Sequence, residues 1–175
     1  MSTHSNTSRR LSRIALGVLA IAATVGACDG ASTETGLVPQ QLLVPGDTIP
    51  GTGQLSELQQ RRAAWVARGI SNYRVELRIS CFCGGDITRP VIIEVRAGAI
   101  TSVVDPETSK PVTNTSAYLT VTGLFDAAIA ERSKGGNVSV AYDRTLGVPV
   151  RLEVGTVAND AGVLYFLSGL VTDDR

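Results

Sequence analysis

The clearest pattern along the chain is an alternation of apolar and polar residues over positions 73–83, YRVELRISCFC. A period of two over this length is typical of a β-strand with one buried side and one side that faces solvent. Phe82 is predicted to lie on the solvent-facing side. The pattern assigns the odd-numbered side chains to the buried side, namely Tyr73, Val75, Leu77, Ile79, Cys81 and Cys83.

Several later segments also have strand patterns. Residues 91–96, VIIEVR, alternate after the turn GGDITRP, which places Ile92 on the outer side of a second strand. If these two strands form a hairpin, Ile92 and Phe82 can meet on its outer face. Further strands are predicted over residues 99–104, 137–143, 148–155 and 163–172.

Two segments have helical patterns instead. Residues 56–69 begin with Ser56 as a predicted N-cap and end at Gly69, and residues 122–136 begin with Thr122 and end in a glycine pair. In the first helix one face is shared by Leu58, Arg62, Trp65 and Val66. The order helix–strands–helix–strands predicts the α+β class. We expect an antiparallel sheet of about five to six strands with two helices packed on one face.

The N-terminal part of the chain predicts an export signal. Residues 1–13 contain three arginines and no acid, and residues 14–27 are small or apolar and uncharged. A basic segment followed by a short apolar segment is the layout of a signal peptide, predicted here over residues 1–27. The sequence VGAC that ends at Cys28 resembles the lipobox of bacterial lipoproteins, in which the cysteine is lipidated and becomes the first mature residue.

This resemblance implies a place in the cell. Acyl chains on Cys28, palmitate among them, would anchor the protein to a membrane on the extracytoplasmic or periplasmic side of the bacterial cell envelope. Each buried lipid CH₂ contributes about 0.8 kcal/mol, and two or more chains anchor stably where one does not. Residues 28–55 are rich in Gly, Thr and Pro and are predicted to be a flexible tether. Residues 56–175 are predicted to form a single domain.

Composition then excludes several functions. The chain has 16 basic and 16 acidic residues, and removal of the signal peptide with its three arginines leaves a net charge of −3. A mildly acidic protein lacks the basic face that nucleic acid requires. The only histidine, His4, lies in the predicted signal peptide. The mature protein is therefore expected to lack Ser-His-Asp or Cys-His catalysis and any histidine-based zinc site. This favours a binding protein over an enzyme. We expect no cofactor and no resident metal.

The cysteines Cys81 and Cys83 leave four interpretations open. A disulfide would join residues about 6.7 Å apart in a regular strand, near the upper limit for such a bond, and Gly84 and Gly85 would allow the necessary bend. With so short a loop it would stabilise the fold by only about 1.6 kcal/mol. The pair could instead be buried thiols, a Cu(I) site or a redox-active pair. We expect a structural disulfide.

Four further motifs stand out in the mature chain, namely CFC at 81–83, VIIEVRAGAITSV at 91–103, GLFDAAI at 123–129 and VAYDRTLGVPVRLEV at 140–154. With these motifs the chain resembles a family of uncharacterised bacterial lipoproteins, the domain of unknown function DUF6174. The resemblance spans about residues 56–171. It implies an exported domain but no activity, because the family has none assigned.

Two functions are consistent with these observations. The first is a membrane-anchored interaction module of the cell envelope, in which Phe82 and Ile92 form a face that meets an envelope protein or a cell-wall partner. The alternative is a thiol-redox or Cu(I)-handling protein that uses Cys81 and Cys83.

Overall fold

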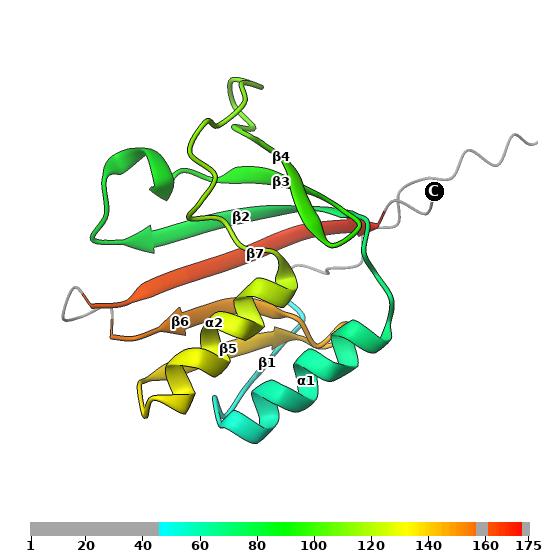
Figure 1. Cartoon of the computed structure of the whole chain (residues 1–175), viewed down its shortest axis with the longest axis vertical. Coiled ribbons are helices and arrows are strands. Elements are labelled where there is room, and N and C mark those ends of the chain that lie inside the picture. The colour runs from blue at the N-terminus through cyan, green and yellow to red at the C-terminus, as the bar shows by residue number, and fades with distance from the viewer. Residues whose placement is uncertain (1–45, 157–160, 173–175) are drawn as a thin grey trace, which may run out of the picture. The chain divides into compact units, whose positions relative to one another are not determined.

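The computed structural model describes residues 46–156 and 161–172, without the side chains of residues 85 and 86. Within these residues the chain forms one antiparallel sheet of seven strands and two α-helices (Figure 1). The predicted signal peptide, Cys28 and most of the predicted tether lie outside the described residues. The predicted α+β class is confirmed, and the sheet is one strand larger than expected.

The sheet has the strand order β1-β5-β6-β7-β2-β3-β4, and every neighbouring pair is antiparallel. The strands are β1 (Thr48–Pro50), β2 (Tyr73–Cys81), β3 (Val91–Arg96), β4 (Ala99–Val104), β5 (Val138–Asp143), β6 (Pro149–Val154) and β7 (Val163–Thr172). The helices are α1 (Leu55–Ala67), α2 (Val121–Ser133) and a short 3₁₀ helix η1 (Gly85–Thr88). The strand β2 therefore lies between β7, from the end of the chain, and β3.

The strand that the sequence pattern does not predict is β1. It has three residues and ends in Pro50, which is too short a run to show an alternation. It pairs with β5 at the edge of the sheet, where Asp47 also forms an ion pair with Arg144 at 2.7 Å. These residues belong to the segment predicted as a tether, so the part of that segment that the structure describes is docked on the domain.

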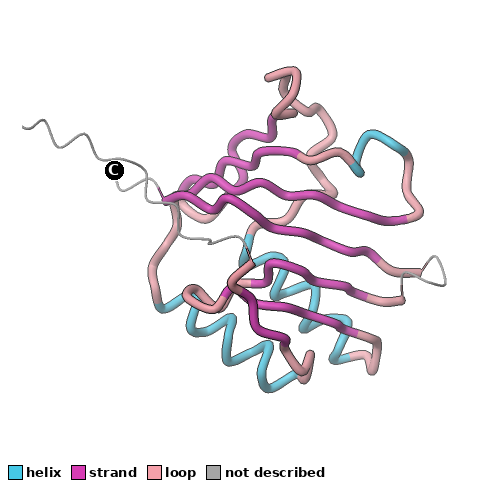
Figure 2. Tube along the Cα trace, turned by 180° about the vertical axis from the view of Figure 1, so that it is seen from behind, coloured by secondary structure: helices cyan, strands magenta, loops and turns pink. Residues whose placement is uncertain are grey.

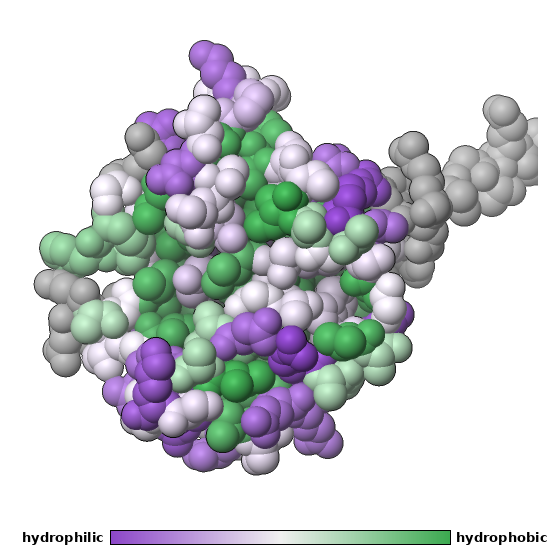
Figure 3. All heavy atoms as spheres, viewed as in Figure 1, coloured by the Kyte–Doolittle hydropathy of each residue, from purple (hydrophilic) through white to green (hydrophobic). Residues whose placement is uncertain are grey.

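The two α-helices lie side by side on one face of the sheet, as predicted, and cover mainly the half that contains β5 and β6 (Figure 1). Seen from behind, the opposite face carries no helix formed by the described residues (Figure 2). The segment between β4 and α2 crosses the helix-bearing face above β2 and β3, and apolar side chains remain visible between it and the helices (Figure 3). The largest fully buried side chains include Leu58, Leu77, Ile93, Leu124, Phe125, Tyr142, Leu152 and Leu170.

The helix ends agree with the sequence better than the helix starts. Both predicted stop signals hold, because Gly69 and Gly135 have positive φ angles of 68° and 81°. Both predicted N-caps are wrong. Ser56 lies inside α1, which begins without a side-chain cap, and α2 is capped by Thr120, whose hydroxyl accepts the N–H of Gly123 at 3.0 Å.

One tertiary contact and one local contact explain why the helix starts differ from the prediction. The hydroxyl of Tyr73 on β2 accepts the N–H of Val121 at 3.0 Å, so α2 begins where it meets the sheet. Glu57 in the first turn of α1 accepts hydrogen bonds from the backbone N–H and the hydroxyl of Thr52, at 2.7 and 2.6 Å. Although burial opposes ionisation, these bonds and Arg61 hold the pKa of Glu57 below its ordinary value.

Candidate functional site

The CFC motif lies where β2 leaves the sheet. The alternation predicted for this strand is confirmed through Ile79, because its odd-numbered residues are buried and its even-numbered residues are exposed or half-buried. The strand ends at Cys81, which pairs with Val163 on β7 and is half-buried against the core. Cys83 is exposed, contrary to its predicted burial, because the chain turns out of the sheet between the two cysteines.

The structure brings Cys81 and Cys83 together as a close pair with their Cα atoms 5.2 Å apart. This separation is shorter than the spacing of residues i and i+2 in a regular strand and lies within the range that a disulfide spans. The bend predicted from the adjacent glycines is therefore present at the end of β2. The arrangement is compatible with the disulfide expected from the sequence.

Phe82 is held between these two cysteines and points away from the protein, with 85% of its surface exposed. Among the described residues, one other large hydrophobic side chain is exposed. It is Val66, which is 54% exposed although the helical pattern assigned it to the apolar face of α1. In that face Leu58 and Trp65 are buried as predicted.

Ile92, the second residue of the predicted interaction face, lies apart from Phe82. In the sheet it pairs with Glu76 on β2 and Val104 on β4, and it is half-buried. The segment that connects β2 to β3 spans residues 82–90 and includes η1, so Phe82 belongs to this connection and not to the paired hairpin. The structure therefore does not bring the two residues together on one face.

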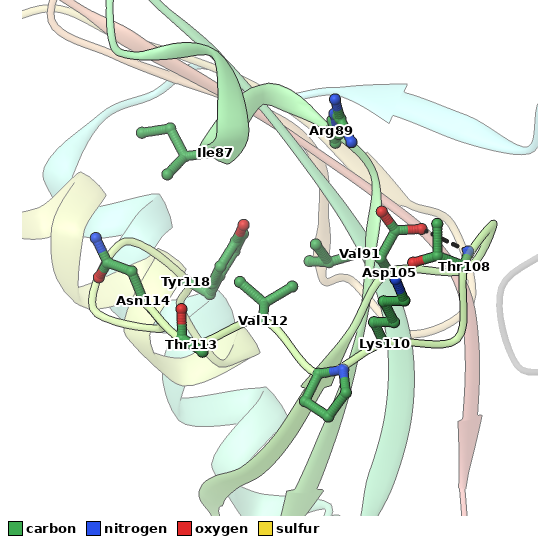
Figure 4. Close-up of a pocket in the computed structure, with 11 residues that line it drawn as sticks. Ile87, Arg89, Val91, Asp105, Thr108, Lys110, Val112, Thr113, Asn114 and Tyr118 are labelled. Atoms are coloured by element: carbon green, nitrogen blue, oxygen red, sulfur yellow. Dashed lines mark hydrogen bonds between the residues drawn. The ribbon is translucent and has the colours of Figure 1, made fainter.

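A pocket lies beside this connection, between η1 and the segment 105–118 (Figure 4). Its volume is about 470 Å³. Its apolar lining is formed by Ile87, Val91, Pro111, Val112 and Tyr118, and its polar lining by Arg89, Asp105, Thr108, Lys110, Thr113 and Asn114. Charged residues from the start of β3 and from the segment after β4 thus meet around an apolar floor.

The carboxylate of Asp105 is already engaged within its own loop. One oxygen accepts the backbone N–H groups of Glu107 and Thr108, at 2.8 and 3.0 Å. These bonds, above all that from Thr108, hold the pKa of Asp105 below its ordinary value, and Arg89 adds a favourable charge. Neither Arg89 nor Lys110 forms an ion pair with a described residue. The site therefore presents two cationic groups beside one carboxylate.

The pocket is the part of the candidate site that sequence reasoning missed. Arg89 and Lys110 are separated by two strands along the chain, and neither belongs to a recognisable motif. The composition of the segment 105–111, DPETSKP, is typical of a loop and indicates no site. Only the return of this loop across the sheet places it opposite η1.

The described residues also bear on metal binding and on membrane-spanning helices. No group of three or more His, Cys, Asp or Glu residues among them is arranged to hold a metal ion. Within this part of the chain no helix is long and apolar enough to cross a membrane.

The motif AYDRTLGVPVRLEV forms the hairpin between β5 and β6. Asp143 is 1% exposed, and its carboxylate accepts the backbone N–H groups of Thr145 and Leu146 in the connecting loop. Its own N–H donates to Val148 at 2.9 Å, which closes the loop. Asp143 is therefore a structural residue of the hairpin, in agreement with the turn-forming residues of the motif.

Together these features define a class of α+β domain. A seven-stranded antiparallel sheet carries both α-helices on one face, and its interior strand β2 ends in a CFC turn beside an open pocket. The chain belongs to DUF6174, a family of unknown function, whose pattern matches residues 57–172. The family resemblance predicted from the sequence is thereby confirmed. No curated protein and no solved structure matches the chain.

Proposed function

We propose that this protein is a lipoprotein of the bacterial cell envelope. In this proposal it is anchored to a membrane by lipid on Cys28, and its extracytoplasmic domain binds an envelope protein or a cell-wall component through Phe82. The observation that carries the binding role is the exposure of Phe82, at 85% of its surface, between the paired cysteines. The anchor rests on the lipobox resemblance at Cys28.

The energetics of Phe82 support a binding role. Burial of a phenylalanine side chain contributes about 1.5–3 kcal/mol, which the isolated domain does not gain at this position. A partner that covers the ring would gain it, and exposed aromatic residues are frequent centres of binding energy. Because the cysteine pair restricts the turn, less conformational entropy is lost when Phe82 is covered.

The location of Phe82 at one end of the sheet also suits a binding role. Cys81 aligns through the strand register with Val163, Val154 and Val138, which together mark one end of the sheet. The described chain enters the sheet at Thr48, which pairs with Asp143 at the other end of β5. The segment that precedes β1 therefore joins the described domain at the end of the sheet away from Phe82.

The anchor and the cysteine pair can be tested together by the intact mass of the protein purified from native membranes, with and without reductant. We expect a chain that begins at Cys28 and carries acyl groups, and we expect reduction to add one hydrogen to each of Cys81 and Cys83. A Cys28→Ala variant serves as the control that receives no lipid. A chain that still begins with Met1 and carries no lipid would contradict the proposed anchor.

The same measurement separates the second candidate function, thiol-redox chemistry or Cu(I) handling. The observation that favours it is the exposure of Cys83, because exposed disulfides are the ones that reductants reach most readily. If alkylation before reduction modifies both Cys81 and Cys83, the disulfide expectation fails. Cu(I) titration of that reduced protein against a competing chelator would then measure whether the two thiols bind the ion.

The binding role predicts a difference between two exposed apolar side chains. A photoreactive phenylalanine analogue at position 82 is expected to give a discrete cross-linked product in intact cells, and the same analogue at position 66 is not. Phe82→Ser is expected to weaken binding to the captured partner by about ten-fold or more, whereas Val66→Ser leaves it unchanged. Equal cross-linking at both positions, or none at position 82, would refute Phe82 as the binding residue.

A further inference from the structure

We propose that the pocket between η1 and the segment 105–118 binds a small amphiphilic carboxylate, a molecule with one anionic head group and a short apolar body. Phe82 does not line this pocket, so the site is separate from the binding role proposed above. The head group would lie against Arg89 and Lys110, and the body over Val91 and Val112.

The first argument is the charge at one side of the pocket. Arg89, Asp105 and Lys110 lie together there (Figure 4). Asp105 is held ionised by the backbone N–H groups of its own loop, with its pKa lowered chiefly by the hydrogen bond from Thr108, so the three groups sum to one positive charge. Both cations lack an ion-pair partner among the described residues and can donate hydrogen bonds to a ligand.

The second argument is the apolar floor next to these charges. Val91 is 2% exposed and Tyr118 is 4% exposed, and both contribute to the lining with the half-buried Val112. The three side chains lie side by side below the space between Ile87 and Arg89 (Figure 4). A volume of about 470 Å³ falls in the range of about 300–1,000 Å³ that is usual for small-molecule sites, which combine an apolar lining with a few polar groups.

The combination of floor and charge restricts the ligand class. A wholly apolar ligand would leave the guanidinium and the ammonium group unpaired and partly desolvated. A cation would be repelled by Arg89 and Lys110, because their two charges exceed the single negative charge of Asp105. A single carboxylate on an apolar body matches both parts of the pocket, because arginine binds carboxylates with two parallel hydrogen bonds.

The walls of the pocket are held by backbone hydrogen bonds before any ligand binds. The N–H of Val112 donates to Val103 on β4 at 2.9 Å, and the N–H of Asp105 donates to Lys110 at 3.0 Å. The N–H of Tyr118 donates to Thr115 at 3.1 Å. A preformed site reduces the entropy that a small ligand must overcome on binding.

The test uses decanoate as the probe and the full chain with Cys28→Ala, which prevents acylation. Methyl NMR signals of Val91 and Val112 report the pocket, and those of Val66 report a distant exposed position. We expect decanoate to shift the pocket signals in a saturable way and to leave Val66 unchanged. Decanol, which has the same apolar body without the charge, is expected to bind about ten-fold more weakly.

Matched charge variants complete the test. Arg89→Gln combined with Lys110→Gln is expected to weaken decanoate binding by about ten-fold or more. Arg74→Gln combined with Lys134→Gln removes the same types of charge outside the pocket and is expected to leave it unchanged. The proposal is overturned if decanoate does not shift Val91 and Val112, if decanol binds equally well, or if both double variants behave alike. None of these results bears on the role of Phe82.

Discussion

Replacement of Gly53 by alanine is expected to destabilise the domain by about 3 kcal/mol. Gly53 connects β1 to α1 with a φ angle of +66°, which L side chains rarely adopt. A Cβ atom at this position would lie 2.4 Å from the backbone oxygen of Val138 on β5. The variant therefore combines left-handed backbone strain with a clash against a strand that cannot move without breaking its pairing. Urea denaturation would measure the loss.

Gly69→Ala is the matched control for this prediction. Gly69 follows α1 with nearly the same φ angle, +68°, but a Cβ atom there would meet nothing within 4 Å. We expect this variant to lose about 1 kcal/mol, from backbone strain alone. If the two variants lose equal stability, the close approach of Gly53 to Val138 is not what requires glycine between β1 and α1.

The second large effect is expected at the hairpin between β5 and β6. Asp143→Ala should destabilise the domain by about 2–3 kcal/mol, because removal of the carboxylate leaves the N–H groups of Thr145 and Leu146 without their acceptor. Asp143 is almost completely buried, and so is Leu146, so water cannot easily replace the lost bonds. Thermal and urea denaturation would measure the change.

Two further variants isolate the physical cause. Asp105 makes the same local pattern, one carboxylate oxygen that accepts N–H groups two and three residues ahead, but in an exposed loop. Asp105→Ala is therefore expected to lose less than about 1 kcal/mol. Asp143→Asn keeps an acceptor oxygen and should retain most of the stability that alanine loses. A loss at position 105 as large as that at position 143 would argue against burial as the decisive factor.

These cases show where prediction from the sequence succeeds. The β2 pattern predicts the buried side chains correctly because a sheet with helices on one face separates alternating residues into a dry set and a wet set. The positive φ angles at Gly69 and Gly135 follow from the special conformational freedom of glycine, which is a property of the residue itself. The close pair of Cys81 and Cys83 follows from sequence proximity together with the adjacent glycines.

The failures have a common cause in long-range contacts. Thr120 caps α2 where Tyr73 meets its first N–H, and no local pattern distinguishes Thr120 from Thr122. The strand β1 exists because β5 offers it an edge to pair with, and its own three residues carry no signal. Ile92 and Phe82 are separated because β2 ends at Cys81, so that Phe82 lies in the connection that contains η1 and outside the paired hairpin.

The sequence by itself determined the family, the α+β class, the CFC motif, the absence of histidine after residue 4, and the alternating faces of β2. These properties depend on residue type and local spacing, which are written along the chain. Only the tertiary structure decided the seventh strand, the exposure of Cys83 after the end of β2, and the pocket that is lined by both Arg89 and Lys110. Such features depend on which distant segments meet. Strand pairing and side-chain packing join residues that lie far apart in the sequence, so their energies cannot be read from local patterns.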